Sequence, residues 1–318
     1  MFYPFYGCKK SENSVELLLG SFPDTVINLS GINSSGDDYN MNLPQLHGEI
    51  PVIFSSNRGS PDGQFDLVQG LITFTFDQTN GNFSVNSEMA GNPFYNSIFS
   101  KTNTPENEFG PYSFFSSVDG YEYFIYSTVN NEGNLDFYYL KHLPYFGSAL
   151  PSINGPFPLT LLNTSSDDAY ICFGTSQDTI YFSSDRDGSF RIYRHARPPG
   201  TTPEAWFNLN HAPSVLIGSL TSEGETKCPY VHRSIMVFAS NRPGGYGGYD
   251  LYYSLFRGGN WSSPVNFGSE INTSSDEYRP VLGTFQDFTN HFMIFSSDRP
   301  GGKGGFDLYL TGIEFPVN

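Results

Sequence analysis

The sequence predicts an all-β fold, a five-bladed β-propeller of four-stranded antiparallel blades. Three observations lead to this prediction: the composition, a hairpin that recurs five times, and a second element that precedes each hairpin. Charged residues make up 15% of the chain and aromatic residues 17%, with 33 glycines and 22 prolines. This mixture suits short strands joined by tight turns. Gly or Pro interrupts nearly every stretch long enough for a stable helix, so we expect little helix.

The recurring hairpin reads as strand, turn and strand, with alternating apolar residues on both sides of a polar, often glycine-rich turn. Its copies lie at residues 53–68, 114–127, 181–194, 237–254 and 294–311. The second serine of a Ser-Ser pair, or the serine in its place, marks each copy: Ser56, Ser117, Ser184, Ser240 and Ser297. The markers recur roughly every 60 residues, which is enough chain for four strands and their turns. Radial repetition of such sheets protects their edges.

The second element enters the innermost strand of each blade. Its copies lie at residues 32–40, 102–110, 162–170, 220–228 and 271–279. An outer strand follows three of the hairpins, with Phe83, Trp206 or Trp261, whereas the fifth hairpin ends near Thr311 with almost no chain left. We therefore expect residues 14–31 to pair beside the strand at 304–311 and to close the ring. Residues 14–318 then form a single domain, and a sixth, degenerate blade is the open alternative.

Aligning the second element places an acid at the same position of every blade: Asp38, Glu108, Asp168, Glu225 and Glu277. The hairpins carry arginines on the same face, with Val118 in the second blade: Arg58, Arg186, Arg242 and Arg299. In one interpretation each arginine bridges to the acid of its own blade. In the other, unpaired acids around the channel mouth bind a cation or a basic partner, and Glu108 is the natural candidate.

The hairpins SNRPGGYGGYDLYYS and SSDRPGGKGGFDLYLT, with INTSSDEYRP before the last, resemble TolB-type, WD-like propeller repeats. The resemblance covers residues 32–311. Repeats of this kind accompany OmpA-like domains in Gram-negative envelopes, although TolB itself has six blades. The resemblance implies a non-enzymatic module for protein interaction, with an envelope protein or a peptidoglycan-associated partner.

Charge and cysteines limit the partners and the location. The net charge of −16 disfavours nucleic acid, and no apolar run of about 18 residues is present, so membrane contact requires an anchor. Cys8 follows Gly7 as in a bacterial lipoprotein, which makes residues 1–13 a leader remnant and tether. We expect a lipidated monomer in the periplasm or at the cell surface. Cys172 and Cys228 suit buried strand positions, or a disulfide between blades in an oxidising compartment.

The sequence contains no nucleophile elbow, phosphate-binding loop or histidine pair at metal-ligand spacing, and its six histidines do not cluster. We therefore predict no enzyme, no cofactor and no metal site. The strongest alternative is a glycan-binding or glycoside-hydrolysing propeller, because five-bladed propellers can host two or three carboxylates in a central pocket. The shared context of the five acids favours structural repetition over such a site.

Overall fold

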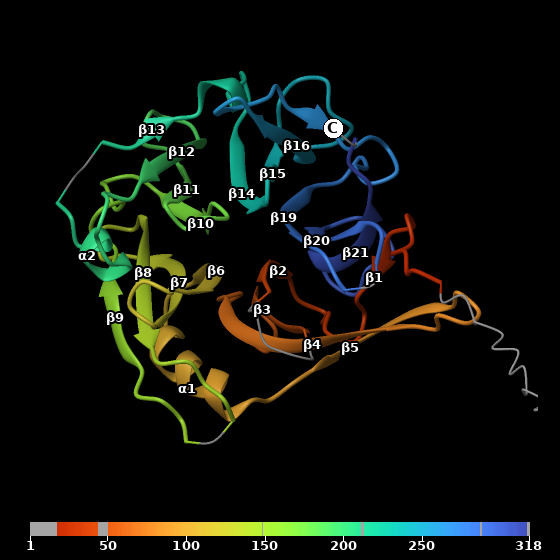
Figure 1. The fold of residues 1–318 in the computed structure, drawn as a ribbon, viewed down its shortest axis with the longest axis horizontal. Coiled ribbons are helices and arrows are strands. Elements are labelled where there is room, and N and C mark those ends of the chain that lie inside the picture. Colours follow the sequence, from red (N-terminus) through yellow and green to blue (C-terminus); the bar gives the residue numbers. More distant parts are fainter. Residues whose placement is uncertain (1–17, 44–49, 148, 211–212, 287, 317–318) are drawn as a thin grey trace, which may run out of the picture.

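The computed structural model describes residues 18–43, 50–147, 149–210, 213–286 and 288–316. Within these ranges the chain forms five antiparallel sheets arranged around a central axis (Figure 1). The predicted five-bladed propeller is therefore confirmed. No helix among the described residues is long and apolar enough to cross a membrane.

The first two blades contain four strands each, ordered from the axis outwards. Blade one comprises β2 (Asp38–Asn42), β3 (Ile50–Ser56), β4 (Asp66–Phe76) and β5 (Phe83–Met89). Blade two comprises β6 (Glu108–Phe115), β7 (Glu122–Val129), β8 (Leu135–His142) and β9 (Asn154–Pro158). The β4–β5 hairpin is long and extends away from the ring (Figure 1).

The remaining blades follow the same order, with short outer strands. Blade three comprises β10 (Asp168–Phe173), β11 (Thr179–Ser184), β12 (Arg191–Ala196) and β13 (Val215–Leu216). Blade four comprises β14 (Thr226–His232), β15 (Ile235–Ser240) and β16 (Asp250–Arg257), with β17 (Asn260–Trp261) and β18 (Val265–Asn266) both pairing with β16. Blade five comprises β19 (Glu277–Gly283), β20 (His291–Ser297) and β21 (Asp307–Ile313).

The N-terminal segment supplies the outer strand of blade five. β1 (Ile27–Asn28) pairs antiparallel with β21, with Ile27 opposite Leu310. This confirms the predicted closure of the ring by residues within 14–31. The backbone N–H of Asp38 also donates to the carbonyl of Phe306, which joins blade one directly to blade five.

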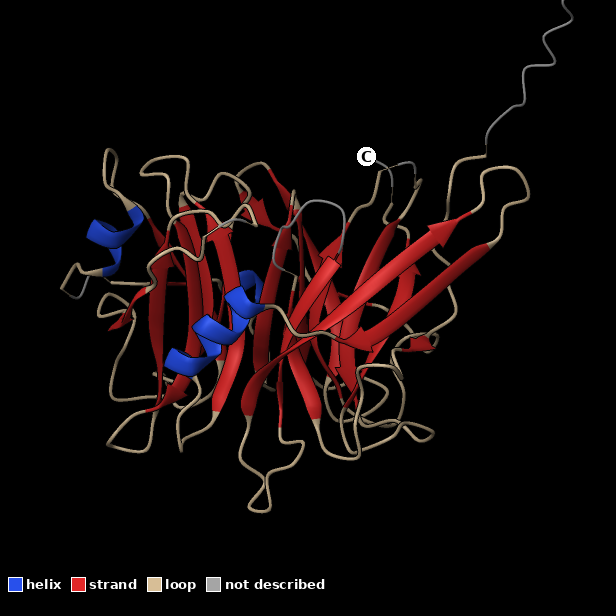
Figure 2. Cartoon of the chain, turned by 90° about the horizontal axis from the view of Figure 1, so that it is seen from below, coloured by secondary structure: helices blue, strands red, loops and turns tan. Residues whose placement is uncertain are grey.

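The core lies between the blades, because each blade packs a face against each neighbour. All six residues of β15 are buried, since a middle strand is covered on both faces. Helix α1 (Pro93–Thr102) starts at Asn92, whose side chain accepts from the N–H of Phe94, and packs where blades one and two meet. Short α2 (Pro203–Phe207) and the 3-10 turn η1 (Gly218–Leu220) complete the helical content described (Figure 2).

All five innermost strands contain a β-bulge at the same place. The register shifts between the second and the fifth residue of each strand, and one residue there has a positive φ. These residues are Asn40 (φ 60°), Gly110 (57°), Tyr170 (59°), Cys228 (56°) and Arg279 (46°). Four of the five are not glycine, so the packing around the axis maintains a backbone conformation that L-residues rarely adopt. We call these five residues the axial layer.

Candidate functional site

The predicted acid–arginine pairs form in blades one, three and five. Arg58 lies 2.6 Å from Asp38, Arg186 2.6 Å from Asp168 and Arg299 3.0 Å from Glu277, and all three acids are fully buried. Each arginine also donates to the hydroxyl of its marker serine and to a carbonyl of the preceding loop. These acids therefore join the hairpin to the loop within a blade, and they are not free around an open channel.

The predicted pair of Glu225 with Arg242 is wrong. Thr226 occupies the acid position of blade four, because it lies opposite Ser240 as Asp38 lies opposite Ser56. Arg242 donates instead to the carbonyl of Leu220 and to the hydroxyls of Ser240 and Thr226. Glu225 is one residue earlier in the repeat than the alignment assumed.

The alignment of blade two is also corrected. Glu108 lies opposite Thr128, so the true hairpin turn follows β7, and Ser117 and Val118 lie in the turn between β6 and β7. No arginine reaches Glu108, which accepts from the hydroxyls of Thr104 and Thr128 while its Oε2 has no partner among the described residues. Burial raises the pKa of this carboxyl to about 7.

The residue before each acid position connects neighbouring blades. Asp37, Asn107, Asp167 and Asp276 accept from the backbone N–H of a hairpin residue in the preceding blade, respectively Phe306, Phe65, Leu135 and Tyr249. We call this contact the interblade clasp. Glu225 holds the equivalent position in blade four. In addition to a hydrogen bond with the backbone of Phe190, it accepts from the Tyr249 hydroxyl and lies 2.7 Å from the Lys227 ammonium.

The environment of Glu225 keeps it charged. Burial alone raises its pKa, but the hydrogen bonds from Lys227 and Tyr249 outweigh that effect and hold the pKa below its ordinary value. Lys227 in turn lies over the rings of Phe190 and Tyr249, at 4.2 and 5.1 Å from the ring centroids.

Aromatic side chains surround the axis at the end where the hairpins and the loops into the inner strands emerge. They come from the second positions of the inner strands and from the ends of the hairpin turns. With Lys227 they form what we call the axial mouth: Tyr39, Phe65, Phe109, Phe190, Tyr249, Tyr278 and Phe306. Tyr39 contacts three of these rings, with centroids at 4.9 Å from Phe65, 5.8 Å from Phe109 and 5.7 Å from Phe306.

The axial mouth is half-buried, and sequence reasoning missed it. The signal was present, because an aromatic residue follows the acid in three blades and ends the hairpin turn in four. Its one charged contact breaks the five-fold repeat. The ion pair of Glu225 with Lys227 and the hydrogen bond from the Tyr249 hydroxyl to Glu225 have no counterpart among the described residues of the other blades.

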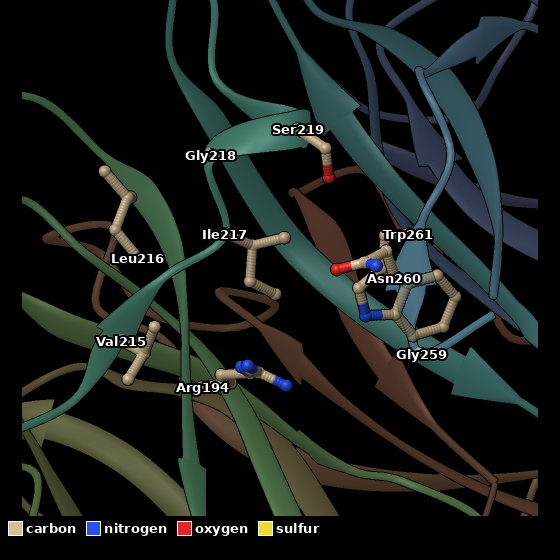
Figure 3. Close-up of a pocket in the computed structure, with 9 residues that line it drawn as sticks. All are labelled: Arg194, Val215, Leu216, Ile217, Gly218, Ser219, Gly259, Asn260 and Trp261. Atoms are coloured by element: carbon tan, nitrogen blue, oxygen red, sulfur yellow. The ribbon is translucent and has the colours of Figure 1, made fainter. Parts of the chain in front are cut away.

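A separate cavity of about 280 Å³ lies towards the periphery, where blades three and four meet (Figure 3). Its walls include Arg194 from β12, Val215 from β13 and Trp261 from β17. None of the lining residues carries a carboxylate. Chemistry that needs paired carboxyl groups is therefore not supported in this cavity.

The structure brings two histidines together, although the sequence suggested that none cluster. The rings of His232 and His291 lie 5.6 Å apart, and burial lowers the pKa of His232 to about 4. Among the described residues no group of three His, Cys, Asp or Glu side chains is arranged to hold a metal ion.

Cys172 and Cys228 are buried free thiols, so the alternative of a disulfide is not realised. Cys8 lies outside the described residues, and its lipidation stays a prediction.

No family model and no curated protein matches the sequence. Solved structures do match the fold. A thermostable family-43 glycoside hydrolase is 13% identical, with a TM-score of 0.58 over 91% of this chain and 94% of that one. An endo-arabinase from Bacteroides thetaiotaomicron is 12% identical, with a TM-score of 0.54 over 93% and 98%. The catalytic domain of a GH62 alpha-L-arabinofuranosidase from Coprinopsis cinerea is 10% identical, with a TM-score of 0.53 over 92% and 97%.

These matches correct two predictions from the sequence. The resemblance to TolB-type repeats is contradicted, because the matching structures are glycoside hydrolases with a propeller fold. The prediction of a non-enzymatic envelope module is contradicted by the same matches, which favour the glycoside-hydrolysing alternative. At this level of identity the likeness establishes the fold, and the chemistry has to be argued from the side chains of the chain itself.

Proposed function

We propose that the protein binds a neutral, pentose-based glycan at the axial mouth and hydrolyses its glycosidic bonds. The observation that carries this proposal is the break in five-fold repetition at Glu225, Lys227 and Tyr249. There an ion pair with hydrogen-bonding capacity lies among the aromatic side chains of the axial mouth. Sites for small organic ligands combine apolar and aromatic walls with a few well-placed polar groups.

The chemistry of the mouth suits a sugar. The flat apolar faces of pyranose and furanose rings pack on aromatic side chains such as Phe65 and Phe109, whose centroids lie 5.4 Å apart. Hydroxyl groups of the sugar would bond to Glu225 and Lys227. A net charge of −16 disfavours acidic glycans, so a neutral chain is expected. Arabinose and xylose polymers are the first choice, because the matching structures include an endo-arabinase and a xylose complex.

Hydrolysis needs one carboxyl group that is protonated and one that is ionised. Glu108 and Glu225 have environments that move their pKa values in opposite directions, Glu108 up to about 7 and Glu225 down. We assign Glu108 as the general acid and Glu225 as the carboxylate that activates water. Glu108 is fully buried and accepts from Thr104 in the turn before its strand, so this assignment requires the turn to move before a substrate can reach the carboxyl.

The test is release of reducing ends from debranched arabinan, arabinoxylan and xylan, with polygalacturonic acid as an acidic comparison. We expect turnover of a neutral polymer. Glu225→Gln should lower kcat about 100- to 10,000-fold, the usual contribution of general acid–base catalysis. The polymer should still bind, which affinity electrophoresis measures. Asp276→Asn is the matched control, because it changes a nearby carboxylate and keeps the acceptor oxygen of the interblade clasp.

The outcomes separate the parts of the proposal. Binding of a polymer by the wild type without any release of reducing ends would leave a glycan-binding propeller and refute hydrolysis. Full activity of Glu108→Gln would refute only the assignment of Glu108 as the general acid, and the rest of the proposal would stand. Absence of both binding and release for all neutral polymers would refute the proposed function.

A further inference from the structure

Arg279 is a buried cation at the centre of the propeller. It belongs to the axial layer, one residue further along its inner strand than Tyr278 of the axial mouth, and it is fully buried. Its Nη2 reaches only the carbonyl of Pro111, at 3.4 Å, while Nε and Nη1 have no hydrogen-bond partner. The guanidinium lies 5.6 Å from the ring centroid of Tyr170.

Among the residues that the structure describes, no carboxylate balances this charge. The arginines of blades one, three and five each lie within 3.0 Å of an acid, whereas no ion pair of Arg279 occurs among the described residues. A guanidinium remains protonated in proteins, so Arg279 cannot escape the cost of burial by losing its charge. An unpaired buried charge is among the most unfavourable features that a folded protein can contain.

The titratable neighbours cannot supply the missing negative charge at neutral pH. Arg279 acts electrostatically on five phenols and thiols, of which Tyr170, Cys172 and Cys228 are buried and Tyr112 and Tyr230 half-buried. Burial outweighs its attraction and raises every one of their pKa values, to about 12 for Cys172 and Tyr230 and about 11 for Cys228. All five groups are therefore neutral, and no described residue supplies the compensating charge.

A second buried polar side chain lies in the same layer. Asn40 is the equivalent of Arg279 in blade one, the next blade around the ring, and it is fully buried. Neither Oδ1 nor Nδ2 of its amide reaches ordinary hydrogen-bond geometry among the described residues, although the amide lies close enough to the hydroxyls of Tyr39 and Tyr170 to oppose the rise in their pKa values that burial causes. Asn40 and Arg279 therefore both lie beside the side chain of Tyr170.

We propose that the axial layer binds one small monovalent inorganic anion of the chloride class. The Nε–H and Nη1–H groups of Arg279 donate to the anion from one side, and the Nδ2 amide group of Asn40 lies in the same layer to complete the contact. The anion neutralises the guanidinium and satisfies donors that the protein leaves unpaired. This site is independent of the proposed hydrolysis, because it is a structural ion at the axis beneath the mouth.

Two measurements on the intact protein test the site. Crystals soaked in sodium bromide should show an anomalous peak within hydrogen-bonding distance of Nε and Nη1 of Arg279. In solution, replacing methanesulfonate by chloride at constant ionic strength should raise Tm by about 5 °C once chloride is about 100-fold above its Kd. Arg279→Gln should abolish the chloride response. Arg242→Gln is the matched control and should keep it, because Arg242 already has carbonyl and hydroxyl partners.

The wild-type measurements decide the question even if Arg279→Gln does not fold. A bromide peak at Arg279 together with a saturable rise in Tm supports the site. Equal Tm values in chloride and methanesulfonate, or a chloride response without bromide at Arg279, would overturn it.

Discussion

Blades one, three and five differ from blades two and four in the residues that join their loops. The first three bury an acid against an arginine, whereas blade four replaces the acid by Thr226 and blade two replaces the arginine's position by Asn130. The repeated residues therefore hold the blades together. The departures from the repeat leave Glu108 without a counterion and direct Glu225 into the axial mouth, which is where a function specific to this chain would be found.

The paired blades carry a cost as well as a gain. Burial raises the pKa of Glu277 above its ordinary value even though Arg299 and three hydrogen bonds oppose that rise. Desolvation of the carboxylate is thus only partly offset by its partner, as is common for buried ion pairs. The pairs define how the loop and the hairpin of a blade meet. Removing one partner of a buried pair lowers stability more than replacing both partners, because the remaining charge is left buried without a counterion.

The largest expected effect follows from breaking one of these pairs. Arg299→Ala should lower the free energy of unfolding by about 3–5 kcal/mol, because it leaves Glu277 buried without a counterion. Arg242→Ala should cost about 1–2 kcal/mol, because its partners are a carbonyl and two hydroxyls that carry no charge. Urea denaturation at pH 8 measures both.

The pH dependence provides the control for this comparison. Without Arg299 the Glu277 carboxyl binds a proton more readily, so the deficit of Arg299→Ala should shrink as the pH falls towards 5. The deficit of Arg242→Ala should not change in this way. Equal losses for the two variants at every pH would show that the paired and unpaired blades do not differ in energy.

A smaller effect is expected at Glu108 in blade two. Its folded pKa of about 7 exceeds the ordinary value of 4.5, so the folded state binds the proton more tightly than the unfolded state. The wild type should therefore lose stability as the pH rises from about 4.5 to 7, by up to about 3 kcal/mol. Glu108→Gln stays neutral, and its stability should not fall over this range.

The two variants should consequently diverge with pH. Glu108→Gln should match the wild type near pH 4.5 and exceed its stability above pH 7, as thermal melting at several pH values would show. Glu277→Gln is the matched control and should be destabilised, because Arg299 then loses its carboxylate. A Glu108→Gln variant that is less stable than the wild type at pH 8 would contradict the unpaired state of this carboxyl.

Sequence periodicity was sufficient for the fold. The hairpins and their loops recur with one spacing, and ring closure followed from the missing outer strand of the fifth copy, which β1 supplies. Blade two misled the alignment because Ser116 and Ser117 imitate the serine pair of the other hairpins, while the true partner of Glu108 is Thr128. The stretch with Ser116 and Ser117 and the stretch with Thr128 are both followed by turn residues. Only the pairing of β6 with β7 shows which of them faces Glu108.

The site was less predictable for a physical reason. A shift of one residue in a strand moves a side chain to the opposite face, so the difference between Glu225 and Thr226 decides whether a carboxylate meets Arg242 or the axial mouth. The axial mouth is assembled from hairpins and inner strands of different blades. The chain does not show which of its aromatic residues meet at the axis until the ring is closed.

The interblade clasp should give the smallest effect and the sharpest comparison. Asp276 accepts from the N–H of Tyr249 at 2.6 Å, and it is only half-buried. Asp276→Ala should lower the free energy of unfolding by about 1–2 kcal/mol, because the N–H loses an acceptor. Asp276→Asn should cost less than half of this, since Asn107 makes the same contact in blade two with an amide oxygen. Denaturation curves of the two variants, measured side by side, test this. Equal losses would mean that the negative charge matters more than the hydrogen bond, and blade two would then have the weakest junction of the clasped blades.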